Sequence, residues 1–199
     1  MAAVPVLVFS DFTSPFCHVT EAALRRLEAE GLAAPRYAAF ELYPPGTALP
    51  ATPSADEIAA ARALAEELGI ALTAPAALPR TRKAHEAARF AEAKGVGREM
   101  REAVFAAYFR DGRDVGRIDV LVELGAALGL DATETKVVLD VDSLSGTVAA
   151  DQALARRLGI AAVPALVVGG GAGAELLTGA RSYSELRALL ERRGTDPRN

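Results

Sequence analysis

Strand-forming sequence is confined to the two ends of this chain of 199 residues. Apolar runs with β-branched or strand-type residues occur at 4–10, 36–42, 163–168 and 175–178, whereas the long stretch 47–139 carries little strand signal. A chain with this pattern is expected to build an α/β sheet from both of its ends and to insert a block of helices between them.

The composition indicates a globular protein and excludes several kinds of partner. Hydrophobic residues make up 51% and charged residues 24% of the chain, which is ample for a core and too apolar for a disordered protein. The net charge of −4 argues against nucleic acid or an anionic membrane surface as the main partner. No apolar run is long enough to cross a bilayer, and the first residues lack the basic start of a signal peptide. We therefore expect a cytoplasmic protein.

The first strand and the first helix meet at a sequence with strong boundary signals. Ser14 is a good N-cap residue, and Pro15 lies at the first helical position, where proline is tolerated. Apolar residues then recur at helical spacing until Gly31. Together with the strands at 4–10 and 36–42, this order predicts a parallel β-α-β unit.

The middle of the chain is predicted to be helical. The expected helices lie near 54–68, 81–94, 98–109, 118–128, 133–139 and 143–158. Ser54 and Glu57 have the spacing of a capping box. Beyond the last two strands, Ser182 is expected to cap a final helix that runs through Leu190.

The best candidate for a reactive site is Ser14-Pro15-Phe16-Cys17, which contains the one cysteine of the chain. The segment lies at the end of a parallel strand, where open α/β sheets place their sites. The helix N-terminus lowers the pKa of the Cys17 thiol if the thiol points to the exposed end. The alternative is that Cys17 is a small buried hydrophobe behind the cap. A single cysteine excludes an internal disulfide.

The dipeptide Val163-Pro164 is the second feature of interest. Proline at the entry of an apolar strand removes a hydrogen-bond donor from the sheet. A cis peptide bond there leaves the preceding backbone free to bind an extended substrate. Because cis bonds before proline are uncommon, the sequence alone favours trans.

The two histidines permit more than one interpretation. His18 follows Cys17 and favours a thiolate if its ring is protonated, or it is simply a solvated residue of the first turn. His85 is expected to make a hydrogen bond between domains rather than to act as a base. Two isolated histidines and one cysteine do not have the spacing of metal ligands, so no metal is expected.

Two segments carry a resemblance to a known family. Ser14-Pro15-Phe16-Cys17 and Gly159-Ile160-Ala161-Ala162-Val163-Pro164, with a helical block between them, resemble the DsbA-like branch of the thioredoxin superfamily. The resemblance covers about residues 4–192 and is greatest to the FrnE-like group. Two further stretches fit that group: Ala84-His85, and Ala107-Tyr108-Phe109 through Gly112-Arg113-Asp114-Val115.

The resemblance implies a thioredoxin-like fold with an all-helical insertion. Residues 1–46 and 140–199 are then the thioredoxin-like domain, and 47–139 the helical one. It also implies that Val163 and a cis Pro164 face the motif, and that Pro15 and Phe16 contribute to substrate binding.

The motif departs from the family at its first position. The attacking cysteine of C-x-x-C is replaced by Ser14, so disulfide exchange within the chain is chemically excluded. The implied function is that of a thiol-disulfide oxidoreductase homologue with a degenerate motif. Cys17 then acts at most as a monothiol, with glutathione or a protein thiol as its partner.

A serine at this position also resembles the kappa-class glutathione transferases and 2-hydroxychromene-2-carboxylate isomerases. There the hydroxyl stabilises the thiolate of glutathione, which implies the same role for Ser14. However, Gly179-Ala180-Arg181-Ser182 lacks the carboxylate that this branch has before its final helix. A third alternative is a non-catalytic peptide-binding module. No tightly bound cofactor is expected, glutathione is a candidate cosubstrate, and the oligomeric state, a homodimer included, stays open.

Overall fold

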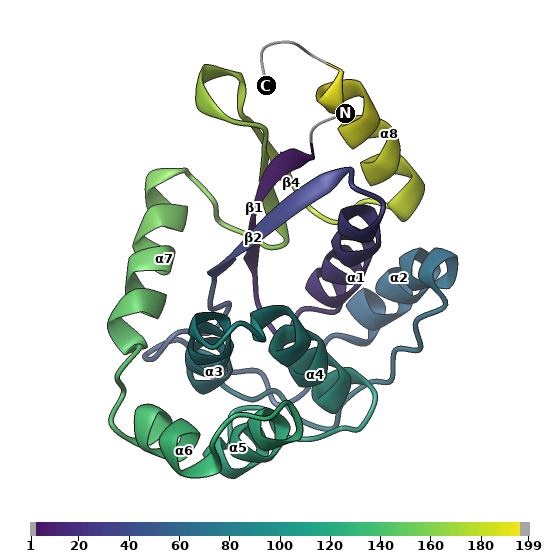
Figure 1. Ribbon diagram of the computed structural model, residues 1–199. Coiled ribbons are helices and arrows are strands. Elements are labelled where there is room, and N and C mark those ends of the chain that lie inside the picture. Colours follow the sequence, from purple (N-terminus) through teal and green to yellow (C-terminus); the bar gives the residue numbers. More distant parts are fainter. Residues whose placement is uncertain (1–2, 196–199) are drawn as a thin grey trace.

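The described part of the chain, residues 3–195 of the computed structural model, is built around a four-stranded sheet. The strands are β1 (Val4–Ser10), β2 (Ala33–Ala39), β3 (Ala165–Val168) and β4 (Glu175–Thr178), in the order β2-β1-β3-β4. β1 pairs in parallel with β2, with Val4 opposite Ala33, and antiparallel with β3, with Phe9 opposite Ala165. Strands from the two ends of the chain therefore lie side by side (Figure 1), as predicted.

Helices cover both faces of this sheet because β1 is apolar on both sides. Val4, Val6 and Val8 pack on one face with α1 (Pro15–Ala29) and α8 (Tyr183–Gly194). Phe9 packs on the other face with residues around α7 (Ser145–Arg157). This arrangement is the thioredoxin-like fold expected from the sequence.

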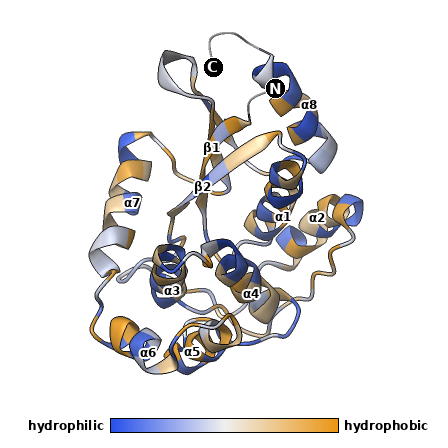
Figure 2. Cartoon of the chain, in the orientation of Figure 1, coloured by the Kyte–Doolittle hydropathy of each residue, from blue (hydrophilic) through white to orange (hydrophobic). Residues whose placement is uncertain are grey.

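The middle of the chain forms the predicted block of helices. Its members are α2 (Ala55–Ala65) with a following 3₁₀ turn (Glu66–Leu68), α3 (Arg82–Ala93), α4 (Gly97–Phe109), α5 (Ile118–Ala127) and α6 (Ala132–Asp140). Most helices show hydrophobic and hydrophilic bands in Figure 2, as expected where one face is buried.

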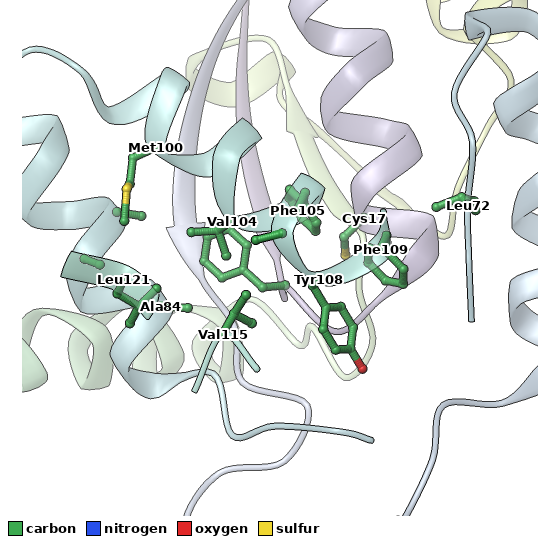
Figure 3. Packing of buried hydrophobic residues seen from close by; sticks show 14 of the residues in the cluster. Cys17, Leu72, Ala84, Met100, Val104, Phe105, Tyr108, Phe109, Val115 and Leu121 are labelled. Carbon is green, nitrogen blue, oxygen red and sulfur yellow. The ribbon is translucent and has the colours of Figure 1, made fainter. Parts of the chain in front are cut away.

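The helical block does not have a core of its own, because its apolar cluster continues into the sheet-bearing part. Phe12, Cys17 and Val19 belong to the same buried cluster as Phe105 and other residues of α4. Figure 3 shows Cys17 beside Phe105 and Phe109. The division into 1–46 with 140–199 and 47–139 stays a prediction, and residues 1–2 and 196–199 lie outside the described part.

The second strand was predicted at 36–42, but it runs from Ala33 to Ala39. Phe40 N still donates to Ser10 O, but side chains accept from the N–H groups on either side of it. Asp151 of α7 accepts from Ala39 N, and Gln152 accepts from Glu41 N. The strand therefore ends earlier than predicted. The sequence pattern near residue 39 does not show this, because the two acceptors are more than a hundred residues away.

Other boundaries differ for local reasons. β3 begins at Ala165 rather than 163, after a proline that has no N–H to give to the ladder. α8 continues to Gly194 instead of Leu190. A complete capping box forms between Ser182 and Glu185. For the capping box predicted at Ser54 and Glu57, the described structure shows one of its two hydrogen bonds, from Glu57 N to Ser54 Oγ.

Candidate active site

Ser14 caps α1, as the sequence predicted. Its backbone is extended (φ −86°, ψ 118°), and its Oγ accepts a hydrogen bond of 3.3 Å from Cys17 N. Pro15 follows at the first helical position. The serine is 5% exposed, so its hydroxyl is held at the edge of the interior by the helix that it begins.

Cys17 lies in the core behind this cap. The side chain is 0% exposed and packs among the aromatic residues of α4 (Figure 3). Burial raises the pKa of its thiol to about 12, although hydrogen bonds from Ser14 and Ser10 and the backbone at Asp11 oppose the shift. The lowered pKa expected for an exposed thiol is therefore not found, and the structure matches the alternative of a buried hydrophobe.

This burial predicts slow reaction of Cys17 with thiol reagents. A neutral thiol without solvent access reacts only after α1 opens locally. Labelling of the native protein at pH 8 is therefore expected to be at least about a hundredfold slower than labelling in denaturant. The measurement is the rate of reaction with an aromatic disulfide reagent, with and without guanidinium chloride. Rapid stoichiometric labelling of the folded protein would show that Cys17 is accessible after all.

Ser14 and Phe16 open onto a cleft of about 330 Å³ that also contains Val163. The Val163-Pro164 peptide bond is cis. The structure thus brings together three of the residues singled out in the sequence. Pro15 and Pro164 are buried and do not line the cleft, and Pro164 O accepts a hydrogen bond from Gly179 N.

The walls of this cleft combine apolar and polar side chains. Leu42, Tyr43 and Leu78 are among the apolar ones, and Glu57 is the one charged residue among the described lining residues. Apolar surface beside a small number of polar groups is the usual lining of a small-molecule site.

His18 faces a different cavity. Its ring stacks with Phe105 and Phe109, at centroid distances of 5.0 and 5.5 Å, and lines a cavity of about 210 Å³ between α1 and α4. Burial, with a smaller contribution from Arg25, lowers the pKa of His18 to about 4. The ring is uncharged at neutral pH and supplies no positive charge to Cys17.

Asp11 is a residue near the cleft that the sequence did not single out. Its carboxylate accepts hydrogen bonds from Leu42 N at 2.5 Å and from Thr13 N at 3.0 Å, and thereby fixes the wall of the cleft to the turn that precedes Ser14. Burial raises the pKa of Asp11 to about 6, against the effect of these hydrogen bonds. Its position directly after a strand was the available signal.

A buried ion pair lies one helical turn behind Cys17. Arg101 of α4 donates two hydrogen bonds, of 2.7 and 2.5 Å, to the carboxylate of Glu21, which also accepts from the hydroxyl of Ser10. The guanidinium is held between the rings of Phe12 and Tyr37. This pair joins α1 to the helical block behind the site.

The described residues contain no cluster of three or more histidine, cysteine, aspartate or glutamate side chains arranged to hold a metal ion. In the same part of the chain, no helix has the length and apolarity needed to span a membrane.

The fold and the site place the chain in a family. The model of the DSBA-like thioredoxin domain matches residues 5–191, so the chain belongs to this family of thiol-disulfide oxidoreductases and isomerases. The family resemblance and the fold expected from the sequence are thereby confirmed, and membership agrees with the expectation of an enzyme.

Individual relatives agree with this assignment. The uncharacterized protein YwbO of Bacillus subtilis is 31% identical over 179 residues, which cover 83% of this chain and 87% of YwbO. A probable DsbA oxidoreductase from Streptomyces coelicolor superposes with a TM-score of 0.81 at 24% identity, covering 97% of this chain and 91% of the other.

Two further structures share the fold at lower identity. The cytosolic disulfide reductase DsbM from Pseudomonas aeruginosa has a TM-score of 0.74 at 19% identity, with coverage of 95% and 98% of the two chains. A 2-hydroxychromene-2-carboxylate isomerase has a TM-score of 0.73 at 20% identity, with coverage of 96% and 94%.

Proposed function

We propose that the protein is a thiol-dependent isomerase or transferase that binds glutathione, or a small thiol like it, above Ser14. The proposal rests on the different positions of Ser14 and Cys17 within the motif. The serine at the first position opens onto the cleft, whereas the one sulfur of the chain is buried with a raised pKa. The reacting sulfur is therefore supplied by the ligand.

Ser14 is suited to hold such a sulfur as a thiolate. Its Oγ accepts from Cys17 N, and the hydroxyl proton, which within the described residues faces only the neutral Cys17 sulfur, can be given to a charged acceptor in the cleft. A hydrogen bond to a charged sulfur is stronger than one to a neutral thiol, and the N-terminus of α1 favours negative charge at the same place. Both effects lower the pKa of the bound thiol and raise its nucleophilicity at neutral pH.

Two structural neighbours are consistent with a thiol ligand in this fold. DsbM was also determined with GSH, at 19% identity to this chain, and another neighbour is a 2-hydroxychromene-2-carboxylate isomerase. The proposal also assumes a reducing compartment such as the cytoplasm, where a free thiol persists.

A monothiol role for Cys17 is less well supported. The first turn of α1 must open before its sulfur can attack or be attacked, and the raised pKa of the thiol then opposes formation of the thiolate. Mixed disulfides at Cys17 are expected to form only after such opening.

Calorimetric titration with glutathione tests the proposal. Saturable binding is expected, and at a hundred times the dissociation constant the ligand adds about 2.7 kcal/mol to the free energy of unfolding. Because Ser14→Ala removes the donor to the sulfur, we expect it to weaken binding of glutathione about tenfold while binding of S-methylglutathione is unchanged.

The matched control is Ser182→Ala, which removes an N-cap of the same kind from α8, away from the cleft. Each substitution costs about 1 kcal/mol of stability through the lost cap, so affinity is compared at a temperature where every variant is folded. If millimolar glutathione produces neither heat nor stabilisation, the glutathione proposal fails and a peptide-binding module becomes the better interpretation.

A further inference from the structure

A third cavity, of about 250 Å³, lies between the edge strand β2 and the helices α3 and α4. It shares no lining residue with the cleft above Ser14. On α3 its lining runs from His85 to Glu92 along one helical face, a length of about 10 Å. The cavity is therefore an elongated groove, with His85 at one end and the start of α4 at the other.

His85 is a buried polar residue whose ring makes no hydrogen bond of normal geometry within the described structure. It is 1% exposed, and the backbone of Phe40 lies close enough to oppose the fall in the pKa of the ring. The hydrogen bond between domains expected from the sequence is present only as this weak contact. One face of the ring packs against Phe12. Burial and the nearby arginines lower the pKa of His85 well below its usual value, so the ring is neutral and offers one donor and one acceptor. An unpaired polar group in the interior costs free energy that a bound ligand can recover.

The opposite end of the groove is arranged for an anion. α4 begins at Gly97 without a side-chain cap, which leaves the N–H groups of its first turn for another acceptor. A Cβ atom on Gly97 would lie 2.7 Å from Glu92 Cα, so only glycine allows α4 to begin this close to α3. Arg98 follows Gly97 and also lines the groove.

The charges along the groove are unequal. Four arginines and two glutamates line it: Arg36, Arg89, Arg98, Arg101, Glu28 and Glu92. Arg98 pairs with Glu28, Arg89 pairs with Glu92 and Asp151, and Arg101 pairs with Glu21. The side chain of Arg36, exposed on β2, makes no ion pair or hydrogen bond with any described residue. The excess positive charge of the groove is therefore that of Arg36, whose guanidinium is free to bind a ligand.

We propose that this groove binds a small elongated organic anion with a carboxylate or phosphate at one end and a second polar group at the other. The oxyanion lies at the start of α4 between Arg36 and Arg98, and the second polar group reaches His85. The site is independent of the thiol proposed above Ser14.

The histidine rings provide a test in the unaltered protein. The chain has two histidines. His18 lines the adjoining cavity next to α1, which shares Tyr37, Arg98 and Arg101 with the groove but does not include His85. Titration with adipate, followed by NMR of the imidazole rings, is expected to shift the signals of His85 and to leave those of His18 in place. Its neutral analogue adipamide is expected to shift neither. Unchanged His85 signals at tens of millimolar adipate would overturn the proposal.

Calorimetry on two variants separates the two ends of the groove. Arg36→Gln is expected to weaken adipate and inorganic phosphate about tenfold each, because a charge-assisted hydrogen bond is lost from the anion end. His85→Phe keeps the ring but not its nitrogens, and is expected to weaken adipate while phosphate binds as before. The matched control is Arg192→Gln, in the last turn of α8. If Arg192→Gln weakens binding of adipate and phosphate as much as Arg36→Gln does, the effect comes from the net charge of the protein, and the groove is not the binding site.

Discussion

Replacing Ser14 with cysteine is expected to give the protein a disulfide-reducing activity that the natural chain lacks. The new thiol lies in the cleft at the N-terminus of α1, where the helix lowers its pKa and favours the thiolate. That thiolate attacks a substrate disulfide, forms a mixed disulfide and releases one substrate thiol. When the first turn of α1 opens, Cys17, three positions later, loses its proton and attacks the mixed disulfide, and the second substrate thiol leaves as an internal disulfide forms. The measurement is reduction of insulin in the presence of dithiothreitol, for Ser14→Cys against the natural protein.

The double variant Ser14→Cys/Cys17→Ser separates attack from resolution. It still carries the nucleophile that lines the cleft, so it is expected to accumulate mixed disulfides with insulin or glutathione without turnover, as seen by mass spectrometry. Ser14→Ala is the negative control for both steps. If Ser14→Cys folds as the natural protein does and reduces insulin no faster than Ser14→Ala, the site is not an altered dithiol site.

The parts of the fold that sequence predicted well depend on local chemistry. Ser14 and Pro15 define the start of α1, and Ser182 with Glu185 defines the start of α8, because a cap is made by residues a few positions apart. The end of β2 was misplaced because Asp151 and Gln152 of α7 accept hydrogen bonds from Ala39 N, at the end of the strand, and from Glu41 N beyond it.

The properties of the candidate site depend on contacts between distant segments. The motif placed Cys17 in the first turn of α1, but its burial comes from packing against α4, which local periodicity does not report. Glu21 and Arg101 are 80 residues apart. In the sequence, each has the pattern of an ordinary charged residue on a helix, so their ion pair is not predicted. Likewise, the lack of a hydrogen bond of normal geometry at the His85 ring within the described structure is visible only once α3 is placed beside β2.

Removing one member of the Glu21–Arg101 pair is expected to destabilise the protein by about 3–5 kcal/mol, because the remaining charge stays buried without a partner. In Arg101→Met, the carboxylate of Glu21 keeps the hydroxyl of Ser10 as its described donor. In Glu21→Leu, the guanidinium of Arg101 stays between the rings of Phe12 and Tyr37 without a carboxylate. For a chain of this size the loss corresponds to a fall in Tm of roughly 6–20 °C, measured by calorimetry.

The double variant Glu21→Leu/Arg101→Met decides whether the cost is that of an unpaired charge or of lost packing. Because it removes both charges and keeps apolar volume, it is expected to be more stable than either single variant, with a favourable coupling of about 1–3 kcal/mol in the cycle. Arg25→Met is the matched control: Arg25 joins the same two helices through Glu102, but this pair is about half exposed and is expected to contribute less than about 1 kcal/mol. If the double variant is as unstable as the sum of the two single variants, the pair acts through independent packing. The charges behind Cys17 then do not depend on each other.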